Sequence, residues 1–84
     1  MKNLKRLISF IIYDKPAYRT IEDYSAKRID KHGGFDLEIF RNKILISKIS
    51  YGKNTKLLTF DFINATDDEK EIISRAVASC LNLE

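Results

Sequence analysis

The sequence predicts a small α+β domain in which helices pack on a three-stranded antiparallel β-meander, in the order α(α)βββα. Three observations lead to this prediction. Near both ends of the chain, apolar residues recur with the 3.6-residue period of a helix. Between Phe35 and Ile63 the period changes to two, as in half-buried strands. Short turn sequences separate the alternating segments, which is typical of strands that follow one another in a meander.

The length and composition indicate one ordinary globular unit. Eighty-four residues provide a single core, so we expect one domain over residues 1–84. The chain is 44% hydrophobic and 32% charged, a balance that excludes a disordered protein. A single cysteine, Cys80, cannot form an internal disulfide, and a single histidine, His32, leaves too few ligands for a structural zinc site. We therefore expect no metal, no cofactor and a reducing, cytoplasmic location.

Residues 3–13 predict the first helix. Five apolar residues follow the i, i+3, i+4, i+7, i+8 pattern: Leu4, Leu7, Ile8, Ile11 and Ile12. Asn3 is the expected N-cap, and Pro16 disfavours helical geometry before it, so the helix should end near Tyr13 or Asp14. This apolar stretch is far shorter than the ~20 residues that span a bilayer, so a membrane partner is not expected. A basic amphipathic helix that lies on anionic membranes is a third alternative function, after the two given below.

Residues 17–32 admit two interpretations. Thr20, three residues before Asp23, resembles the start of a capped helix, and Gly33-Gly34 would supply the left-handed residue at its end. This pattern favours a helix over residues 20–32. Because the apolar residues here do not form a clean stripe, a strand from Tyr18 to Tyr24 is the alternative, and the sequence does not decide between helix and strand.

The remaining elements are three strands and a last helix. The expected strands are Phe35–Phe40, Ile44–Tyr51 and Lys56–Phe62, with turns at residues 41–43 and 52–54. Thr66 and Glu69 predict a capping box at the start of the last helix. Its apolar stripe consists of Ile72, Ile73, Ala76, Val77, Cys80 and Leu81.

The strands carry apolar residues on both faces. The side that packs on the helices is expected to hold Phe35, Leu37, Ile39, Leu58, Phe60 and Phe62. The other side would then hold Phe40, Leu57 and some of Leu45, Ile49 and Tyr51. An exposed apolar face of this kind marks an interaction surface. The alternative is that the N-terminal helix covers it.

No set of residues indicates catalysis. His32 lies beside two glycines and is expected to be a solvated cation, while Cys80 lies on an apolar stripe and is expected to be a buried thiol. The acids at the start of the last helix suit the positive end of its dipole and match no calcium loop. We therefore expect a protein that is not an enzyme.

Charge is distributed unevenly along the chain. Residues 1–32 carry a net charge of +4, residues 33–40 of −2, residues 41–56 of +5 and residues 57–84 of −4, which together give +3. The basic hairpin consists of Arg41, Lys43, Lys48, Lys53 and Lys56. Such a hairpin can lie along a phosphate backbone, but lysines also protect sheet edges from aggregation.

Two functions are therefore expected. The first is a non-catalytic protein-binding module, a small bacterial inhibitor or accessory protein of the phage or mobile-element type. It would occupy a surface of a larger protein such as a nuclease through Phe40, Tyr51 and Leu57. The second is a nucleic-acid-binding domain that uses the basic hairpin 41–56. A homodimer is compatible with either.

Overall fold

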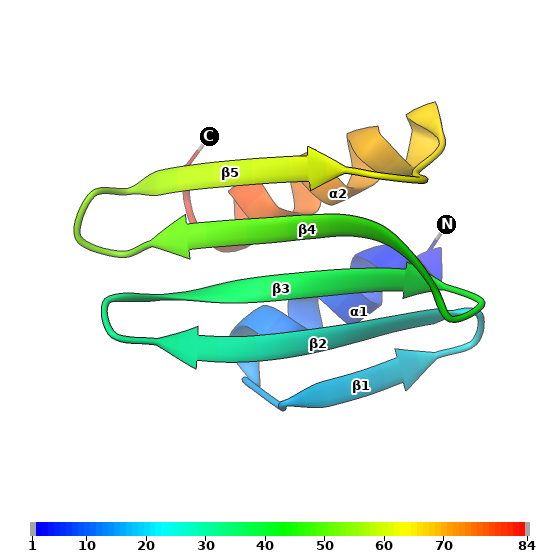
Figure 1. The fold of residues 1–84 in the computed structure, drawn as a ribbon, viewed down its shortest axis with the longest axis horizontal. Helices are drawn as coiled ribbons and strands as arrows, with labels where there is room; N and C mark the ends of the chain where they lie inside the picture. Colours follow the sequence, from blue (N-terminus) through cyan, green and yellow to red (C-terminus); the bar gives the residue numbers. More distant parts are fainter. Residues whose placement is uncertain (1, 84) are drawn as a thin grey trace.

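The computed structural model describes residues 2–83 and contains two helices and five strands (Figure 1). In chain order the elements are α1 (Lys2–Tyr13), β1 (Tyr18–Ile21), β2 (Tyr24–Lys31), β3 (Gly34–Arg41), β4 (Ile44–Gly52), β5 (Leu57–Phe62) and α2 (Asp67–Cys80). The strands form one antiparallel sheet in the order β1-β2-β3-β4-β5. The α+β class and the antiparallel meander are confirmed, but the sheet has five strands and not three.

The helix expected over residues 20–32 is wrong, because this segment forms the hairpin of β1 and β2. Ile21 pairs with Tyr24, so only two residues make the turn, and the first of them, Glu22, has a left-handed φ of 54°. Thr20 and Asp23 resemble a capping box because polar residues of this kind are common both at helix starts and in tight turns.

Arg28 interrupts the alternation of apolar and polar residues along β2. Tyr24, Ala26 and Arg28 lie on the side of the helices, and Arg28 occupies a position where an apolar residue would normally alternate. Its buried guanidinium lies 4.1 Å from the centre of the Phe35 ring. The same group donates hydrogen bonds to the backbone carbonyls of Ile11 (2.9 Å) and Ile12 (3.2 Å), near the C-terminus of α1. A cation is favourable there because it satisfies carbonyls that the helix leaves free.

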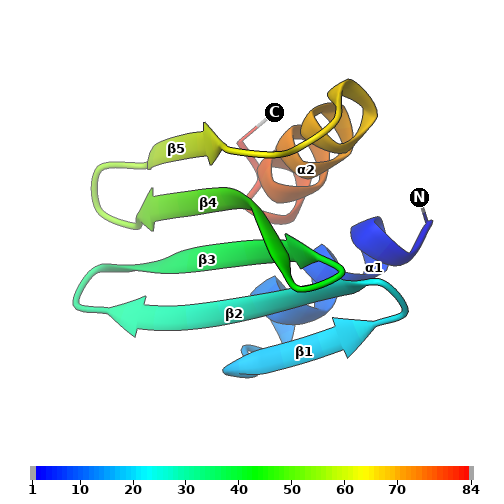
Figure 2. The same ribbon diagram turned by 45° about the vertical axis from the view of Figure 1, so that its right-hand side comes forward.

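Both helices lie on one face of the sheet (Figures 1 and 2). The core between them and the sheet contains the whole apolar stripe predicted for α1, which is 0–6% exposed. Because these side chains are occupied in the core, the alternative of a membrane-surface helix is wrong. In the described chain, no helix is long and apolar enough to cross a membrane. The helix ends at Tyr13 as expected, but it begins at Lys2, so Asn3 lies within it.

A β-bulge decides which face each residue of β4 occupies. Phe40 pairs with Leu45, whereas Ile39 pairs with Ser47, so Ile46 is an extra residue on β4. The bulge reverses the alternation along the strand. Leu45 therefore lies on the face away from the helices, while Ile49 and Tyr51 lie in the core.

Ser47 is fully buried, and its hydroxyl has no hydrogen-bond partner within residues 2–83. Burial of an unpaired hydroxyl costs free energy, because its bonds to water are lost and not replaced. We expect Ser47→Ala to raise the free energy of unfolding by about 1 kcal/mol, measured by urea denaturation. A loss of similar size would show that the hydroxyl is bonded in solution.

Candidate protein-binding surface on the open sheet face

No helix in the described chain covers the second face of the sheet, which we call the open face; it is turned toward the viewer in Figure 1. One row of paired residues crosses all five strands at its centre. The row consists of Tyr18, Lys27, Glu38, Lys48 and Asp61, each paired with the next. Cations and anions alternate in neighbouring positions, an arrangement that stabilises a sheet.

A hollow of about 250 Å³ lies on the open face over β2 to β5. Its lining on this face consists of Ile29, Asp36, Glu38, Lys48, Ser50, Thr59 and Asp61. Three of these lining residues are acids and one is a lysine, while Lys31 and Lys27 lie beside Asp36 and Glu38 just outside the lining. Ile29 is 49% exposed and supplies an apolar rim.

Asp36 is held in its ionised form. Lys31 Nζ lies 2.6 Å from one carboxylate oxygen, and Ser50 donates a hydrogen bond of 2.8 Å to the other. Partial burial tends to raise the pKa of Asp36, but the bonds from Lys31 and Ser50 outweigh it and hold the pKa below its ordinary value. The hollow therefore keeps this negative charge over the whole neutral pH range.

The three residues predicted for partner binding do not lie together. Tyr51 is a core residue, 6% exposed, and its ring packs against Phe35 with centroids 5.5 Å apart. The expectation that Tyr51 is exposed is therefore wrong, because the bulge in β4 turns it inward. Phe40 and Leu57 do lie on the open face, at opposite ends of it: Phe40 pairs with Leu45, and Leu57 pairs with Gly52.

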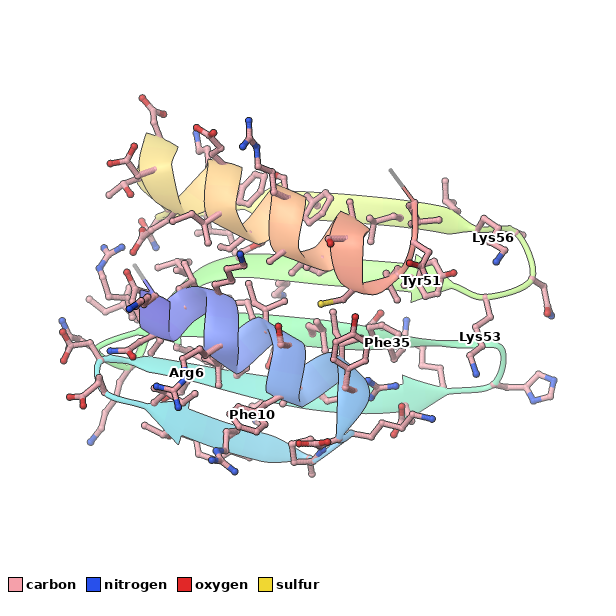
Figure 3. All side chains as sticks on the ribbon, turned by 180° about the vertical axis from the view of Figure 1, so that it is seen from behind. Arg6, Phe10, Phe35, Tyr51, Lys53 and Lys56 are labelled. Carbon is pink, nitrogen blue, oxygen red and sulfur yellow. The ribbon has the colours of Figure 1, made fainter. Side chains whose placement is uncertain are left out.

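The five basic residues of the predicted hairpin do not form one patch. Arg41 is bound to Glu69, and Lys48 lies between Glu38 and Asp61 on the open face. Lys43 lies in the β3–β4 turn, whereas Lys53 and Lys56 lie in the β4–β5 turn at the other end of the sheet (Figure 3). A continuous basic hairpin surface is therefore absent from the structure.

A smaller basic group forms where two turns meet. The backbone N–H of Lys53 donates to the carbonyl of Gly33 (2.7 Å), which joins the β4–β5 turn to the β2–β3 turn. Lys31, the last residue of β2, and His32 directly precede Gly33. His32 is exposed. This end of the sheet gathers cations from two hairpins that lie far apart in the sequence.

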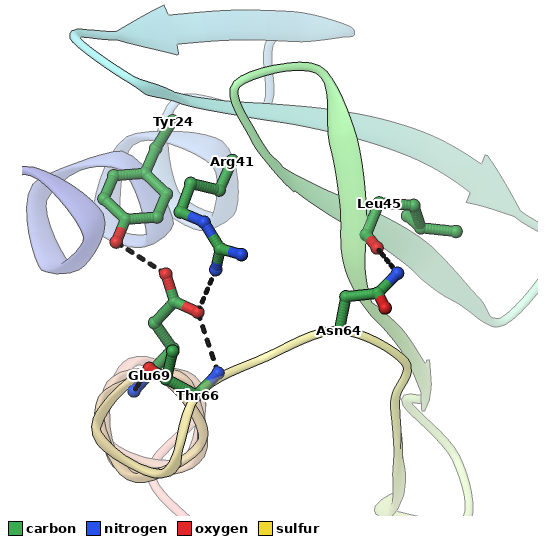
Figure 4. A network of polar contacts seen from close by, with 6 residues as sticks. All are labelled: Tyr24, Arg41, Leu45, Asn64, Thr66 and Glu69. Atoms are coloured by element: carbon green, nitrogen blue, oxygen red, sulfur yellow. Dashed lines mark hydrogen bonds and ion pairs between the residues drawn. The ribbon is translucent and has the colours of Figure 1, made fainter.

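Glu69 was predicted to complete a capping box, and the structure shows more. The capping box with Thr66 is confirmed, with Thr66 N–H donating to Glu69 Oε1 (2.9 Å) and Glu69 N–H donating to Thr66 Oγ1 (3.2 Å). The carboxylate, whose residue is 1% exposed, also accepts bonds from Tyr24 Oη (2.7 Å) and Arg41 Nη1 (Figure 4). The sequence near Glu69 could not predict Tyr24 and Arg41 as its partners, because these residues lie on β2 and β3.

The Glu69 network joins α2 to the sheet, and none of its residues lines any of the main hollows of residues 2–83. Next to it, the side chain of Asn64 donates to the carbonyl of Leu45 (3.1 Å), which fixes the segment before α2 on β4 (Figure 4). Within residues 2–83, no three His, Cys, Asp or Glu residues gather as metal ligands. Cys80 is half-buried against α1, where its sulfur lies 3.8 Å from Ser9 Oγ.

Comparison of the chain with protein-family models, with curated proteins and with solved structures finds no match.

Proposed function

We propose that this protein is a non-catalytic protein-binding module that presents the open face of its sheet to a larger protein. The observation that carries the proposal is an acidic hollow beside exposed apolar side chains on an uncovered sheet. It would act as a small inhibitor or accessory protein, of the kind that phages and mobile elements encode. The lone Cys80 is compatible with action in a reducing cytoplasm.

The hollow suits one side chain of a protein partner better than a free ligand. Its volume of about 250 Å³ lies below the ~300–1,000 Å³ of most small-molecule sites. Arginine fits its chemistry, because a guanidinium binds carboxylates through two parallel hydrogen bonds and its stem packs on apolar atoms such as those of Ile29. Arginine is also among the residues that dominate binding energy at interfaces.

A partner with a basic surface follows from this charge. Proteins that hold nucleic acids do so with grooves rich in Lys and Arg, so a nuclease presents the surface that the hollow requires. Exposed Ile29, together with Tyr18 at the end of the central row, would supply the apolar contact around the charged centre.

The same charges argue against nucleic acid on the open face. Glu38 and Asp61 flank Lys48, and both would lie against any phosphate that this lysine contacts. The only nucleic-acid contact that we still consider is therefore at the end of the sheet, where Lys53 and Lys56 lie beside the β2–β3 turn. Two or three phosphate contacts there would give a slope of only about −2 to −3 in log K against log[salt].

Charge reversal in the hollow tests the proposal. The partner is first captured from the source cells on immobilised protein, identified by mass spectrometry and purified. Its affinity is then measured by calorimetry for the wild-type protein, Glu38→Lys and the control Glu71→Lys. Glu71 is an exposed acid of α2 on the opposite side of the molecule, so its reversal changes net charge equally. We expect Glu38→Lys to cost at least about 2 kcal/mol, roughly thirtyfold in Kd, and Glu71→Lys to cost little.

Two results would contradict the proposal. One is a purified partner that binds the wild-type protein and Glu38→Lys equally well. The other is a ligand that proves to be DNA or RNA and is lost when Lys53 and Lys56 are replaced by serine.

A further inference from the structure

The two edges of the sheet are built differently. Strand β1 has four residues, follows Pro16 closely and carries Arg19. Shortness, proline and charge are the usual means by which edge strands avoid pairing with another chain. Strand β5 has six residues, Leu57–Phe62, with Asp61 as its single charge and with no proline or bulge. The β5 edge therefore lacks the protection that the β1 edge has.

The hydrogen-bonding groups of β5 can be assigned to its two sides. Ile63 N–H donates to the carbonyl of Ile46 on β4 (3.0 Å), so the residues of odd number turn their N–H and C=O groups toward β4. Because these groups alternate along a strand, the residues of even number turn theirs outward. They are Leu58, Phe60 and Phe62. Three N–H groups and three C=O groups thus lie along the free edge.

We propose that a second copy of this chain pairs with β5 in antiparallel fashion, with a two-fold axis at Phe60. In this register Phe60 lies opposite the partner's Phe60, and Leu58 lies opposite the partner's Phe62. Every outward-facing residue then meets another outward-facing residue, and each such pair exchanges two backbone hydrogen bonds. The result is a continuous ten-stranded sheet with closed two-fold symmetry.

The side chains are self-complementary in this register. On the helix face, the stacked pair of Phe60 and Phe62, 5.6 Å apart in one copy, meets its equivalent in the other. On the open face, Leu57 lies opposite the partner's Ile63, and these two side chains are 65% and 48% exposed in the single chain. Thr59 lies opposite the partner's Asp61, where its hydroxyl can donate to the carboxylate.

Other registers lose these matches. An axis at Thr59 or Asp61 also pairs outward-facing residues, but it places Leu57 opposite the partner's Asp61 in the first case and Asp61 opposite the partner's Asp61 in the second. An axis at Phe62 would extend the pairing into the segment that leads to α2, and an axis at Leu58 would place Phe60 opposite the partner's Lys56. A second copy in the Phe60 register is therefore the occupant that the sequence of β5 fits.

The helices allow this arrangement. The axis is perpendicular to the sheet, so α2 lies beside the partner's α2. The flank of α2 that faces α1 carries Ile72 and Ser79, which line a groove with Lys5. The opposite flank carries Ser74 and Ala78, one turn apart and small enough for two helices to approach closely. This inference does not rest on the proposed function; if both hold, two acidic hollows face the same side of one sheet.

Charge substitutions at Thr59 test the inference with the purified protein alone. Sedimentation equilibrium over a range of concentrations gives the dimer Kd for the wild-type protein, Thr59→Lys and Thr59→Asp. A lysine at position 59 would attract the partner's Asp61, whereas an aspartate there would repel it. The two-fold axis produces this pair twice in the dimer, so each effect on the free energy of dimerisation is doubled. We expect Thr59→Lys to lower Kd and Thr59→Asp to raise it, each by about five- to tenfold. The double variant Thr59→Asp with Asp61→Lys should restore the wild-type Kd or lower it.

Thr20→Asp is the matched control, since Thr20 lies on the open face of the other edge strand and its substitution should leave Kd unchanged. Hydrogen exchange provides a second measurement: the amides of Leu58, Phe60 and Phe62 should be protected in the concentrated wild-type protein and exchange fast in Thr59→Asp. A protein that is monomeric up to millimolar concentration, or a dimer whose Kd is the same in both Thr59 variants, would overturn the inference.

Discussion

Replacement of Val77 by aspartate is expected to unfold the domain. Val77 lies on the inner face of α2 and is fully buried in the core, so the new carboxylate would be removed from water without a partner. Such a substitution costs more than about 4 kcal/mol, which is most of the stability of a small domain. The measurement is circular dichroism during thermal unfolding, in which Val77→Asp should show no cooperative transition.

Ser79→Asp serves as the control for Val77→Asp. It introduces the same charge into the same helix at an exposed position, so we expect a loss of a few tenths of a kcal/mol, mainly from the negative end of the helix dipole. A soluble Val77→Asp protein that melts cooperatively near the wild-type temperature would show that the core face of α2 is misassigned.

Replacement of Glu69 by alanine is expected to give the second large loss of stability. The change removes the acceptor for Arg41 and Tyr24 together with one half of the capping box. Because Arg41 keeps some contact with solvent, we place the loss at about 3 kcal/mol, toward the lower end for a broken buried ion pair. Glu69→Gln keeps the shape and an acceptor oxygen and should lose less, about 1–2 kcal/mol.

Urea denaturation measures both Glu69 variants, with Asp68→Ala as the control. Asp68 is an exposed acid in the same first turn, and its removal should cost only a few tenths of a kcal/mol. Equal losses for Asp68→Ala and Glu69→Ala would show that Glu69 acts only through the helix dipole.

The pH dependence of stability should follow from the same network. Burial tends to raise the pKa of Glu69, but the bonds from the Thr66 backbone, Tyr24 and Arg41 outweigh it and hold the pKa below its ordinary value. The stabilisation is therefore present above the pKa of an unfolded glutamate, about 4, and is lost as the pH falls through the lower pKa of the folded state. Glu69→Gln should lose less stability than the wild-type protein over this acid range.

The alkaline side depends on Tyr24. Burial, and then the neighbouring Glu69 carboxylate, raise the pKa of Tyr24 from 10.0 to about 12. The unfolded tyrosine ionises first, so stability should fall as the pH rises from about 10 to about 12. Tyr24→Phe should reduce this fall.

Local signals account for the parts of the fold that were predicted correctly. The apolar stripe of α1, the capping box of Thr66 and Glu69, and the turn predicted at residues 41–43, which the structure places at Asn42 and Lys43, each depend on residues close together in the chain. The turn confirms this directly, since both residues have left-handed φ values, 49° and 67°, as a two-residue hairpin turn requires. The β1–β2 hairpin was missed because Arg28 stands where an apolar residue would have revealed the period.

The candidate site depended on contacts that local patterns do not contain. The sequence indicated an apolar surplus on the sheet, yet the bulge at Ile46 sent Tyr51 to the core and left Leu45 outside. It also placed five cations in one hairpin, whereas the sheet sets Lys48 between Glu38 and Asp61, Arg41 is bound to α2, and a hydrogen bond joins Lys53 to the β2–β3 turn. The acidic hollow unites residues of four strands, so it exists only once the sheet has its register.

By itself, the sequence determined the class of the fold, both helices, the strands from β3 to β5 and the turns between these strands. These follow from hydrophobic periodicity and capping, which act between near neighbours in the chain. Tertiary structure alone decided the side on which the helices pack, the burial of Arg28 and Glu69, and the charge of the open face. Those properties depend on pairs such as Tyr24 with Glu69, 45 residues apart, whose encounter is set by the register of the sheet and the docking of α2.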